Sequence, residues 1–212
     1  MSLRTLLFCL ALFPGLAVAA PAEELVRPLQ DQWAEIKYRV PEKQQAERYH
    51  ALALKARQLA EAHPGRAEAL IWEGIALSSE AGARGGLGAL PLAEAAKDRL
   101  EAALRLDERA LAGSALTSLG TLFYKVPGWP IGFGDKKRAE TLLKKSLTLN
   151  PDGIDPHFFY GEYLYERERY DEAAKHLETA LKAPARAGRE LADAGRRQEI
   201  AALLDKVRRE MN

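Results

Sequence analysis

Apolar residues recur along most of this chain with the three-to-four-residue spacing of helices that bury one face. In the segment 42–63 they fall on one side of a helix, at Tyr49, Leu52, Ala53, Ala56, Leu59 and Ala60. The same spacing predicts helices at 24–38, 42–63, 67–79, 92–106, 110–125, 136–149, 156–167 and 170–181, then one or two terminal helices as far as Arg209. No alternating apolar-polar pattern persists, so we predict an all-α fold without strands.

Proline and glycine residues separate the predicted helices. The residue before a proline is disfavoured in the helical conformation, so Val40-Pro41 ends the first helix. The tetrapeptide 150–153, Asn-Pro-Asp-Gly, is a strong signal for a helix end followed by a turn. The stretch 81–88 is too rich in glycine for a helix interior, and Gly195 is a candidate break in the terminal helix. These signals divide the chain into helical hairpins.

The apolar pattern also repeats in a fixed register. A glycine on one helix is followed, on the next helix, by a small, a large and a small residue at positions i, i+4 and i+7. The three copies are Gly74 with Ala96, Leu100 and Ala103, Gly120 with Ala139, Leu143 and Ser146, and Gly161 with Ala173, Leu177 and Ala180. We expect each glycine to let the second helix approach closely, with the small-large-small stripe packed against the first.

This register resembles the tetratricopeptide repeat (TPR), most faithfully over 158–164 and 170–177. The resemblance covers about 67–185, and 49–64 more loosely. It implies a TPR-like solenoid of about four helical hairpins in a single domain. The implied parts are a domain at 20–212, clearest repeats at 67–108, 110–151 and 154–184, and a capping helix at 186–209. Unrelated helical hairpins with coincident spacing are the alternative.

The chain departs from the TPR pattern at two neighbouring turns, where about ten residues (82–91) and about seven residues (126–135) are inserted. Such turns lie along one edge of a solenoid, so we expect Trp129 and Phe133 to face Leu87 and its neighbours. These aromatics either line a ligand pocket or pack as a small satellite core. Asp135 is well placed to cap the helix that follows.

The TPR resemblance also implies which residues line the concave surface, namely those three before, one after and four after each marker glycine. They are Ile71, Ile75, Ser78, Thr117, Thr121, Tyr124, Phe158, Glu162 and Tyr165. This lining is largely apolar and hydroxylic, whereas clamps for chaperone C-termini need Lys, Arg and Asn there. The groove therefore suits an apolar or uncharged segment or a small organic ligand, unless the terminal helix of the chain itself fills it.

Charge and chemistry exclude several functional classes. The chain has 31 Lys and Arg against 30 Asp and Glu, a balance that does not attract nucleic acid or an anionic membrane. Its single cysteine, Cys9, excludes a disulfide framework. The four histidines lack metal-ligand spacing, and no serine has an obvious base partner. We expect no catalytic residue, no metal and no cofactor, and therefore no enzyme.

Two arginine-bearing segments near the C-terminus, 186–190 and 194–197, complete the candidates. They could form an anion site. The favoured interpretation is the polar outer face of a capping helix, which solenoids need for solubility.

The first residues have the form of a secretory signal peptide. Arg4 precedes an apolar run, 6–17, and Ala17-Val18-Ala19 fits a signal peptidase site. We expect cleavage after Ala19, which places the mature protein in the periplasm. The apolar run is too short to span a bilayer comfortably, and no later stretch is apolar enough, so we expect no membrane span in the mature protein. An uncleaved anchor, and lipidation at Cys9, are the alternatives.

Two functions follow as hypotheses. The leading one is a periplasmic TPR-like scaffold that engages a protein or peptide partner through its concave groove. The second hypothesis rests on the sequence 127–135 followed by Ala139. This sequence resembles the T component of tripartite, periplasmic-binding-protein-dependent (TRAP) transporters. That resemblance implies an accessory protein that binds a small or apolar ligand and associates with a periplasmic solute-binding protein, although such components are usually lipid-anchored. Solenoid edges can self-associate, so a homo-oligomer is an open option.

Overall fold

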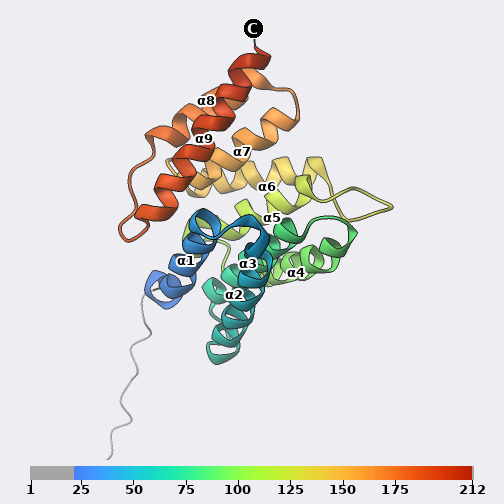
Figure 1. Cartoon of the computed structure of the whole chain (residues 1–212), viewed down its shortest axis with the longest axis vertical. Helices are drawn as coiled ribbons and strands as arrows, with labels where there is room; N and C mark the ends of the chain where they lie inside the picture. Colours follow the sequence, from blue (N-terminus) through green and yellow to red (C-terminus); the bar gives the residue numbers. More distant parts are fainter. Residues whose placement is uncertain (1–21, 212) are drawn as a thin grey trace, which may run out of the picture.

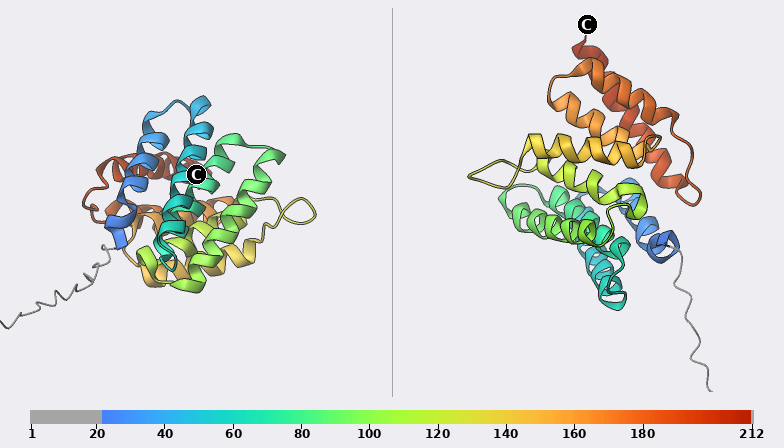
Figure 2. Two further views of the ribbon diagram at one scale, coloured as in Figure 1. Left: turned by 90° about the horizontal axis from the view of Figure 1, so that it is seen from below. Right: turned by 180° about the vertical axis from the view of Figure 1, so that it is seen from behind.

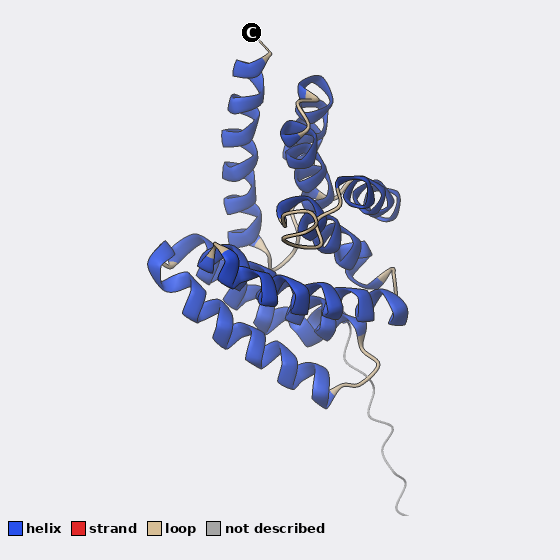
Figure 3. Cartoon of the chain, turned by 90° about the vertical axis from the view of Figure 1, so that its right-hand side faces the viewer, coloured by secondary structure: helices blue, strands red, loops and turns tan. Residues whose placement is uncertain are grey.

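The computed structural model describes residues 22–211, and this range folds entirely as helices and connecting loops (Figures 1 and 3). Its nine α-helices are α1 (Ala22–Arg39), α2 (Glu42–Ala62), α3 (Ala67–Arg84), α4 (Leu90–Leu106), α5 (Ser114–Lys125), α6 (Lys136–Leu149), α7 (Ile154–Glu166), α8 (Tyr170–Lys182) and α9 (Glu190–Glu210). Two short 3-10 helices, η1 (Leu87–Ala89) and η2 (Ala110–Gly113), precede α4 and α5. The predicted all-α class is confirmed, and the expected signal peptide lies outside the described residues.

Consecutive helices pack against one another as hairpins, namely α3 with α4, α5 with α6, and α7 with α8. The first helices of these hairpins, α3, α5 and α7, also contact each other and form an inner layer. The helices α1 and α9 lie against this inner layer, since α1 contacts α3 and η2, and α9 contacts α7. They also contact each other, although they stand at opposite ends of the sequence (Figures 1 and 2).

The three marker glycines sit where the helices of each hairpin approach most closely. A Cβ atom added to Gly74, Gly120 or Gly161 would lie 2.7 Å, 2.8 Å or 2.9 Å from the Cγ atom of Leu100, Leu143 or Leu177, respectively. All three leucines are fully buried. The expected close approach, glycine against the large residue of the stripe, is thus present in all three hairpins.

The helix α3 runs five residues beyond its predicted end at Ser79 and includes Gly82. Tertiary contacts explain the extension. Glu80 is buried and receives hydrogen bonds from Arg84 and from the ring of His50, and Ala81 is buried in the core. The helix ends at Gly85, whose φ of 63° is accessible to glycine at little cost. The first insertion is therefore the shorter loop 85–89.

Other boundaries also differ from the sequence prediction, and the capping helix predicted at 186–209 begins only at Glu190. The helix α5 begins at Ser114 rather than Ala110, because Leu111 and Ala112 have positive φ angles of 47° and 53°. The helix α9 continues through Gly195 without a break. A Cβ atom at Gly195 would lie 2.4 Å from the ring of Tyr38, so this glycine permits close packing of α1 on α9.

None of the helices in the described range is both long enough and apolar enough to cross a membrane.

Candidate functional site

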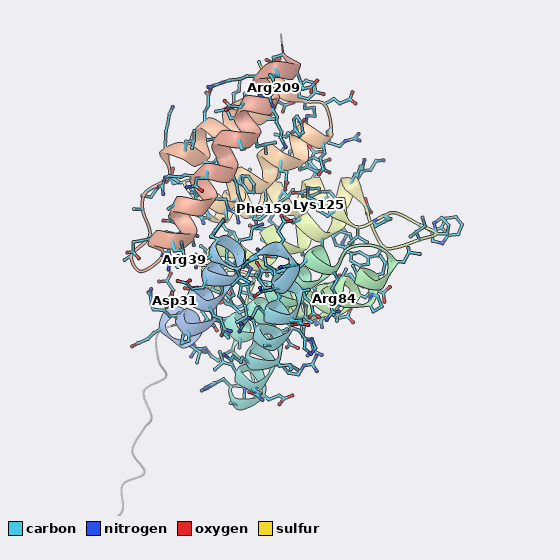
Figure 4. All side chains as sticks on the ribbon, in the orientation of Figure 1. Asp31, Arg39, Arg84, Lys125, Phe159 and Arg209 are labelled. Carbon is cyan, nitrogen blue, oxygen red and sulfur yellow. The ribbon has the colours of Figure 1, made fainter. Side chains whose placement is uncertain are left out.

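A cavity of about 460 Å³ lies between α1, the inner-layer helices and the segment that leads into α9. Its wall includes residues from α1, α3, α5, α7 and 184–196. Helices far apart in sequence therefore enclose it, and it exists because α1 and α9 meet over the inner layer. Phe159, which is labelled near the centre of the molecule in Figure 4, contributes to the wall from α7.

Aromatic side chains form one part of this wall. Trp33 on α1 meets Trp72 on α3 edge to face, with ring centroids 6.5 Å apart, and meets Tyr38 in the same way at 6.0 Å. The Trp33 indole N–H donates a hydrogen bond of 2.9 Å to Ser79 Oγ. These contacts hold α1 on α3 and give the cavity a rigid apolar surface.

Ion pairs form the opposite part of the wall. The Arg186 guanidinium pairs with Asp155 at 2.7 Å and with Asp193 at 2.6 Å. The Arg196 guanidinium pairs with Asp155 at 2.9 Å and with Glu199 at 2.6 Å. Burial opposes ionisation of Asp155, but Arg196 and Arg186 outweigh it and hold the pKa of this carboxyl well below its usual range. The network ties the start of α7 to α9.

Three residues of the cavity wall carry buried polar atoms without a hydrogen-bond partner among residues 22–211. These atoms are Trp72 Nε1, Thr117 Oγ1 and Arg189 Nε. The side chains of Trp72 and Thr117 are almost completely enclosed, since these residues are only 5% and 4% exposed. A buried polar group without a partner costs about 1–3 kcal/mol, and these three atoms lie behind the surface of the wall, since none has appreciable accessible area.

Arg189 differs from the paired arginines beside it. Its guanidinium lies 5.7 Å from the ring centre of Trp72, in a cation–π arrangement. Burial and the neighbouring charge of Arg186 lower the pKa of Arg189. Arg189 is therefore held in the wall by stacking on Trp72 rather than by an ion pair at hydrogen-bond distance.

The structure brings only two of the predicted groove residues, Ile75 and Thr117, to this cavity. Ile71 belongs to the core, and Phe158 is covered by the Arg196 guanidinium at 4.4 Å from its ring centre. The Thr121 hydroxyl donates to the carbonyl oxygen of Thr117 on its own helix. At Phe158 the predicted groove position is therefore covered by α9.

Of the remaining predicted groove residues, Ser78 donates a hydrogen bond to the Ile75 carbonyl oxygen on its own helix, α3, and the other three lie at the far end of α5 and α7. The Tyr124 hydroxyl donates a hydrogen bond of 2.6 Å to Glu162, which also pairs with Lys125 at 3.0 Å. Tyr165 packs beside Tyr170, with ring centroids 5.8 Å apart. Tyr124 and Glu162 thus join neighbouring hairpins, Tyr165 packs within the α7–α8 hairpin, and none of the three lines the cavity.

The insertion 126–135 projects from the molecule as a narrow loop (Figures 1 and 2). Its two aromatic residues have different environments. Phe133 packs edge to face on Phe123, with ring centroids 5.6 Å apart, whereas Trp129 is 90% exposed. Neither lines the cavity.

The loop 85–89 and the loop 126–135 lie next to each other, as expected for turns along one edge of a solenoid. A Cβ atom at Gly132 would lie 3.3 Å from Leu90, just after the first insertion. Leu87 itself is 75% exposed, and Trp129 also points to solvent, so these two do not form a shared apolar core. Of the two aromatic residues in this loop, only Phe133 packs as the small satellite core that the sequence suggested, against Phe123.

The arginines near the C-terminus do not form a polar outer face. Arg196 is only 7% exposed and lies in the buried stripe of α9, one turn after Ala192 and one turn before Ile200. Its position on that apolar stripe is the sequence signal that could have identified it. Arg186 and Arg189 precede α9, so helical periodicity does not predict where their side chains point.

The described residues include no group of three or more His, Cys, Asp or Glu side chains arranged to hold a metal ion. The histidine pair, His157 and His176, is joined by a contact of 2.9 Å between their Nδ1 atoms. His157 Nε2 lies 2.8 Å from the Pro151 carbonyl oxygen, which can only accept. The pair therefore holds the turn between α6 and α7 against α8.

Comparison with known proteins assigns no family to the chain. No protein-family model matches its sequence. No curated protein matches it either. The function is therefore argued from the cavity and its wall.

Proposed function

We propose that this chain is an exported, TPR-like binding protein that holds a small molecule in the cavity between α1, α9 and the inner layer. The observation that carries the proposal is the cavity itself, whose wall combines the aromatic rings of Trp33 and Phe159 with the charged groups of Arg186 and Asp155. Such a wall suits a small organic molecule that has an apolar body and a polar group.

The volume and the surroundings favour a small molecule over a peptide. About 460 Å³ falls within the range of roughly 300–1,000 Å³ that is typical of small-molecule sites. A peptide lying along the inner layer needs an open channel, but α1 and α9 lie across it. The accessory-protein hypothesis is therefore preferred to the peptide scaffold, and association with a periplasmic solute-binding protein remains part of this proposal.

Native mass spectrometry of the purified protein tests the proposal. The parent should show a mass above that of the polypeptide, and this excess should disappear on denaturation. Ser118 lines the cavity, so Ser118→Phe should reduce the bound fraction by filling part of the space. Thr148→Phe, at an exposed position on α6, is the matched control and should retain the ligand. A bare polypeptide mass under gentle conditions counts against the proposal.

A protein partner is the second candidate, and the exposed loop tip favours it. Trp129 and Ile131 are 90% and 57% exposed on the projecting loop, and Trp is enriched at the energetic centres of protein interfaces. A pull-down from periplasmic extract should lose its specific partner with Trp129→Ala but keep it with Leu54→Ala, an exposed apolar control on α2. Equal capture by both variants removes the loop from consideration.

A further inference from the structure

We infer that the ligand of this cavity is an uncharged molecule whose amide or hydroxyl group binds the side-chain amide of Gln30. The inference rests on the proposed function and specifies the class of its ligand. It is carried by one buried side chain that faces the cavity without a partner in the protein, and by the pairing of the charges around it.

Gln30, in the middle of α1, is a buried polar side chain that opens onto the cavity. It lines the cavity and is only 5% exposed. Its amide makes no hydrogen bond to any of the residues 22–211. Unlike Trp72 Nε1 and Thr117 Oγ1, however, the amide atoms of Gln30 are not sealed behind the wall and keep accessible surface. A ligand in the cavity can therefore reach this amide directly.

The chemistry of an amide limits what can replace its water. A ligand that fills the cavity removes water from the Gln30 amide and must supply hydrogen bonds in its place, because a buried polar group without a partner is unfavourable. The amide has two N–H donors and one carbonyl acceptor. Another amide or a hydroxyl can both donate and accept, whereas a carboxylate only accepts and an ammonium group only donates. An amide or hydroxyl head group is therefore the best match.

The other available polar groups of the wall are also neutral. Ser114 and Ser118 line the cavity from α5, and Asn150 lines it from the end of α6. None of these three side chains makes a hydrogen bond within the part of the chain that the structure describes. Their hydroxyl and amide groups donate and accept in the same way as the Gln30 amide. The cavity thus offers an uncharged ligand several partners of matching chemistry.

The buried charges of the wall, in contrast, already have partners. Arg186 and Arg196 both pair with Asp155, as described above. Arg189 stacks on Trp72, and the negative charge of Asp155 acts on it as well. A charged ligand therefore finds no buried group here whose charge is left without compensation.

The remaining charged groups of the wall lie towards solvent. Glu23 and Asp152 are exposed. Arg27 donates, at an exposed site, to the main-chain carbonyl oxygens of Ala187 and Gly188, at 3.4 Å and 3.2 Å. A charged ligand that enters the cavity loses its hydration without gaining a buried counter-ion, which is unfavourable. An uncharged ligand avoids this cost.

Titrations followed by two-dimensional proton–nitrogen NMR spectra test the charge requirement with three probes. The probes are phenylacetamide, phenylacetate and phenethylamine, which share a phenyl ring and are neutral, negative and positive at neutral pH. The parent, dialysed to remove co-purified ligand, should bind the amide about fivefold or more tightly than either charged probe, as expected for one additional hydrogen bond. A charged probe that binds as tightly as the amide overturns the inference and leaves the proposed function standing.

The Gln30 side chain itself provides a second measurement, which requires no substitution. Its NH2 signal, assigned through the bonds that connect it to the Gln30 backbone, should move as phenylacetamide is added to the parent. Binding of phenylacetamide without movement of this signal contradicts the inference.

Substitution of Gln30 connects the preference to its amide. Gln30→Leu removes no internal hydrogen bond, so the fold should be retained, and the affinity for phenylacetamide should fall about fivefold or more. Gln58→Leu, at an exposed position on α2 outside the cavity, is the matched control and should keep the preference of the parent. A preference that survives Gln30→Leu, or is lost equally in Gln58→Leu, contradicts the inference.

Native mass spectrometry separates failure of the inference from failure of the proposed function. If the purified parent carries a bound molecule but none of the three probes moves the Gln30 signal, the inference is overturned and the proposed function stands. A bare polypeptide mass, together with no binding of any probe, overturns both.

Discussion

Replacement of Gly74 by alanine should destabilise the protein, although alanine is the better helix former. Gly74 lies within α3, and its added Cβ atom would be 2.7 Å from Leu100 Cγ, 2.9 Å from Leu100 Cδ2 and 3.2 Å from the Ala96 carbonyl oxygen. Leu100 is fully buried and cannot swing away, and the carbonyl belongs to the backbone of α4. The two helices of the hairpin must therefore separate.

The size of the effect follows from two opposing contributions. Alanine in place of glycine inside a helix stabilises it by about 1 kcal/mol. Overpacking a filled core costs typically about 1–3 kcal/mol, and contacts this short with two buried neighbours place Gly74→Ala near the upper end. The net loss is about 2 kcal/mol, which corresponds to a decrease in Tm of about 4–8 °C for a domain of this size.

Gly82 in the same helix is a matched control. An added Cβ atom there would have no neighbour within 4 Å, so Gly82→Ala gains helix propensity without a clash. It should stabilise the protein by about 0.5 kcal/mol, less than the full value because Gly82 lies in the last turn of α3. Both variants are compared with the parent by urea unfolding followed by circular dichroism, and by thermal unfolding.

The reasoning is refuted if Gly74→Ala is as stable as Gly82→Ala. That result means that α3 and α4 separate at no cost, so that the close approach at the marker glycine does not specify the hairpin. A combined Gly74→Ala and Leu100→Ala variant gives a further check. If the clash is the cause, the second substitution should cost less in the variant background than in the parent.

Three further predictions concern single side chains. Asp135 accepts hydrogen bonds from the main-chain N–H groups of Lys137 and Arg138, so Asp135→Ala should cost about 1 kcal/mol in urea unfolding; no change contradicts its role as N-cap. Asp155→Asn should cost about 2 kcal/mol, because it leaves two guanidinium groups with fewer counter-charges; retention of full stability shows that the network is dispensable. Burial and the neighbouring His157 lower the pKa of His176 to about 4. The neutral form is thus favoured by folding, and the resulting stabilisation, up to about 3 kcal/mol, is present above pH 6.5 and is lost as the pH falls towards 4. His176→Asn should flatten the stability profile between these pH values, and a parallel profile refutes the assignment.

The sequence predicted those parts of the fold that depend on local periodicity. Helix positions follow from apolar spacing, and the register of Gly161 with Leu177 follows from the need to bring two helices close together. The N-cap role of Asp135 was predicted for the same reason, since capping involves only neighbouring residues. The extension of α3 to Arg84 was missed, because it depends on burial of Glu80 next to His50 on another helix.

The cavity was not predictable in the same way. It depends on contacts of α1 with α9 and with the segment before α9, such as those that join Tyr38 to Glu199 and Arg27 to Gly188, and no periodic pattern encodes such a pairing. The TPR resemblance identified Ile75 and Thr117 as inner-layer residues, which was sufficient to indicate one side of the cavity. Arg189 lies on the other side of the cavity, in the segment that precedes α9. Neither helical periodicity nor the TPR resemblance predicts the position of a side chain in that segment.

The contact between α1 and α9 also has a consequence for cooperativity. In an open repeat array each unit contacts only its neighbours, so terminal repeats can fray while the rest stays folded. Here Lys37 and Tyr38 bind Glu199 across about 160 residues of chain, which links the two ends of the array directly. Fraying at either end must first break this link. A ligand held beneath it therefore opposes unravelling from both ends at once, through a single binding equilibrium.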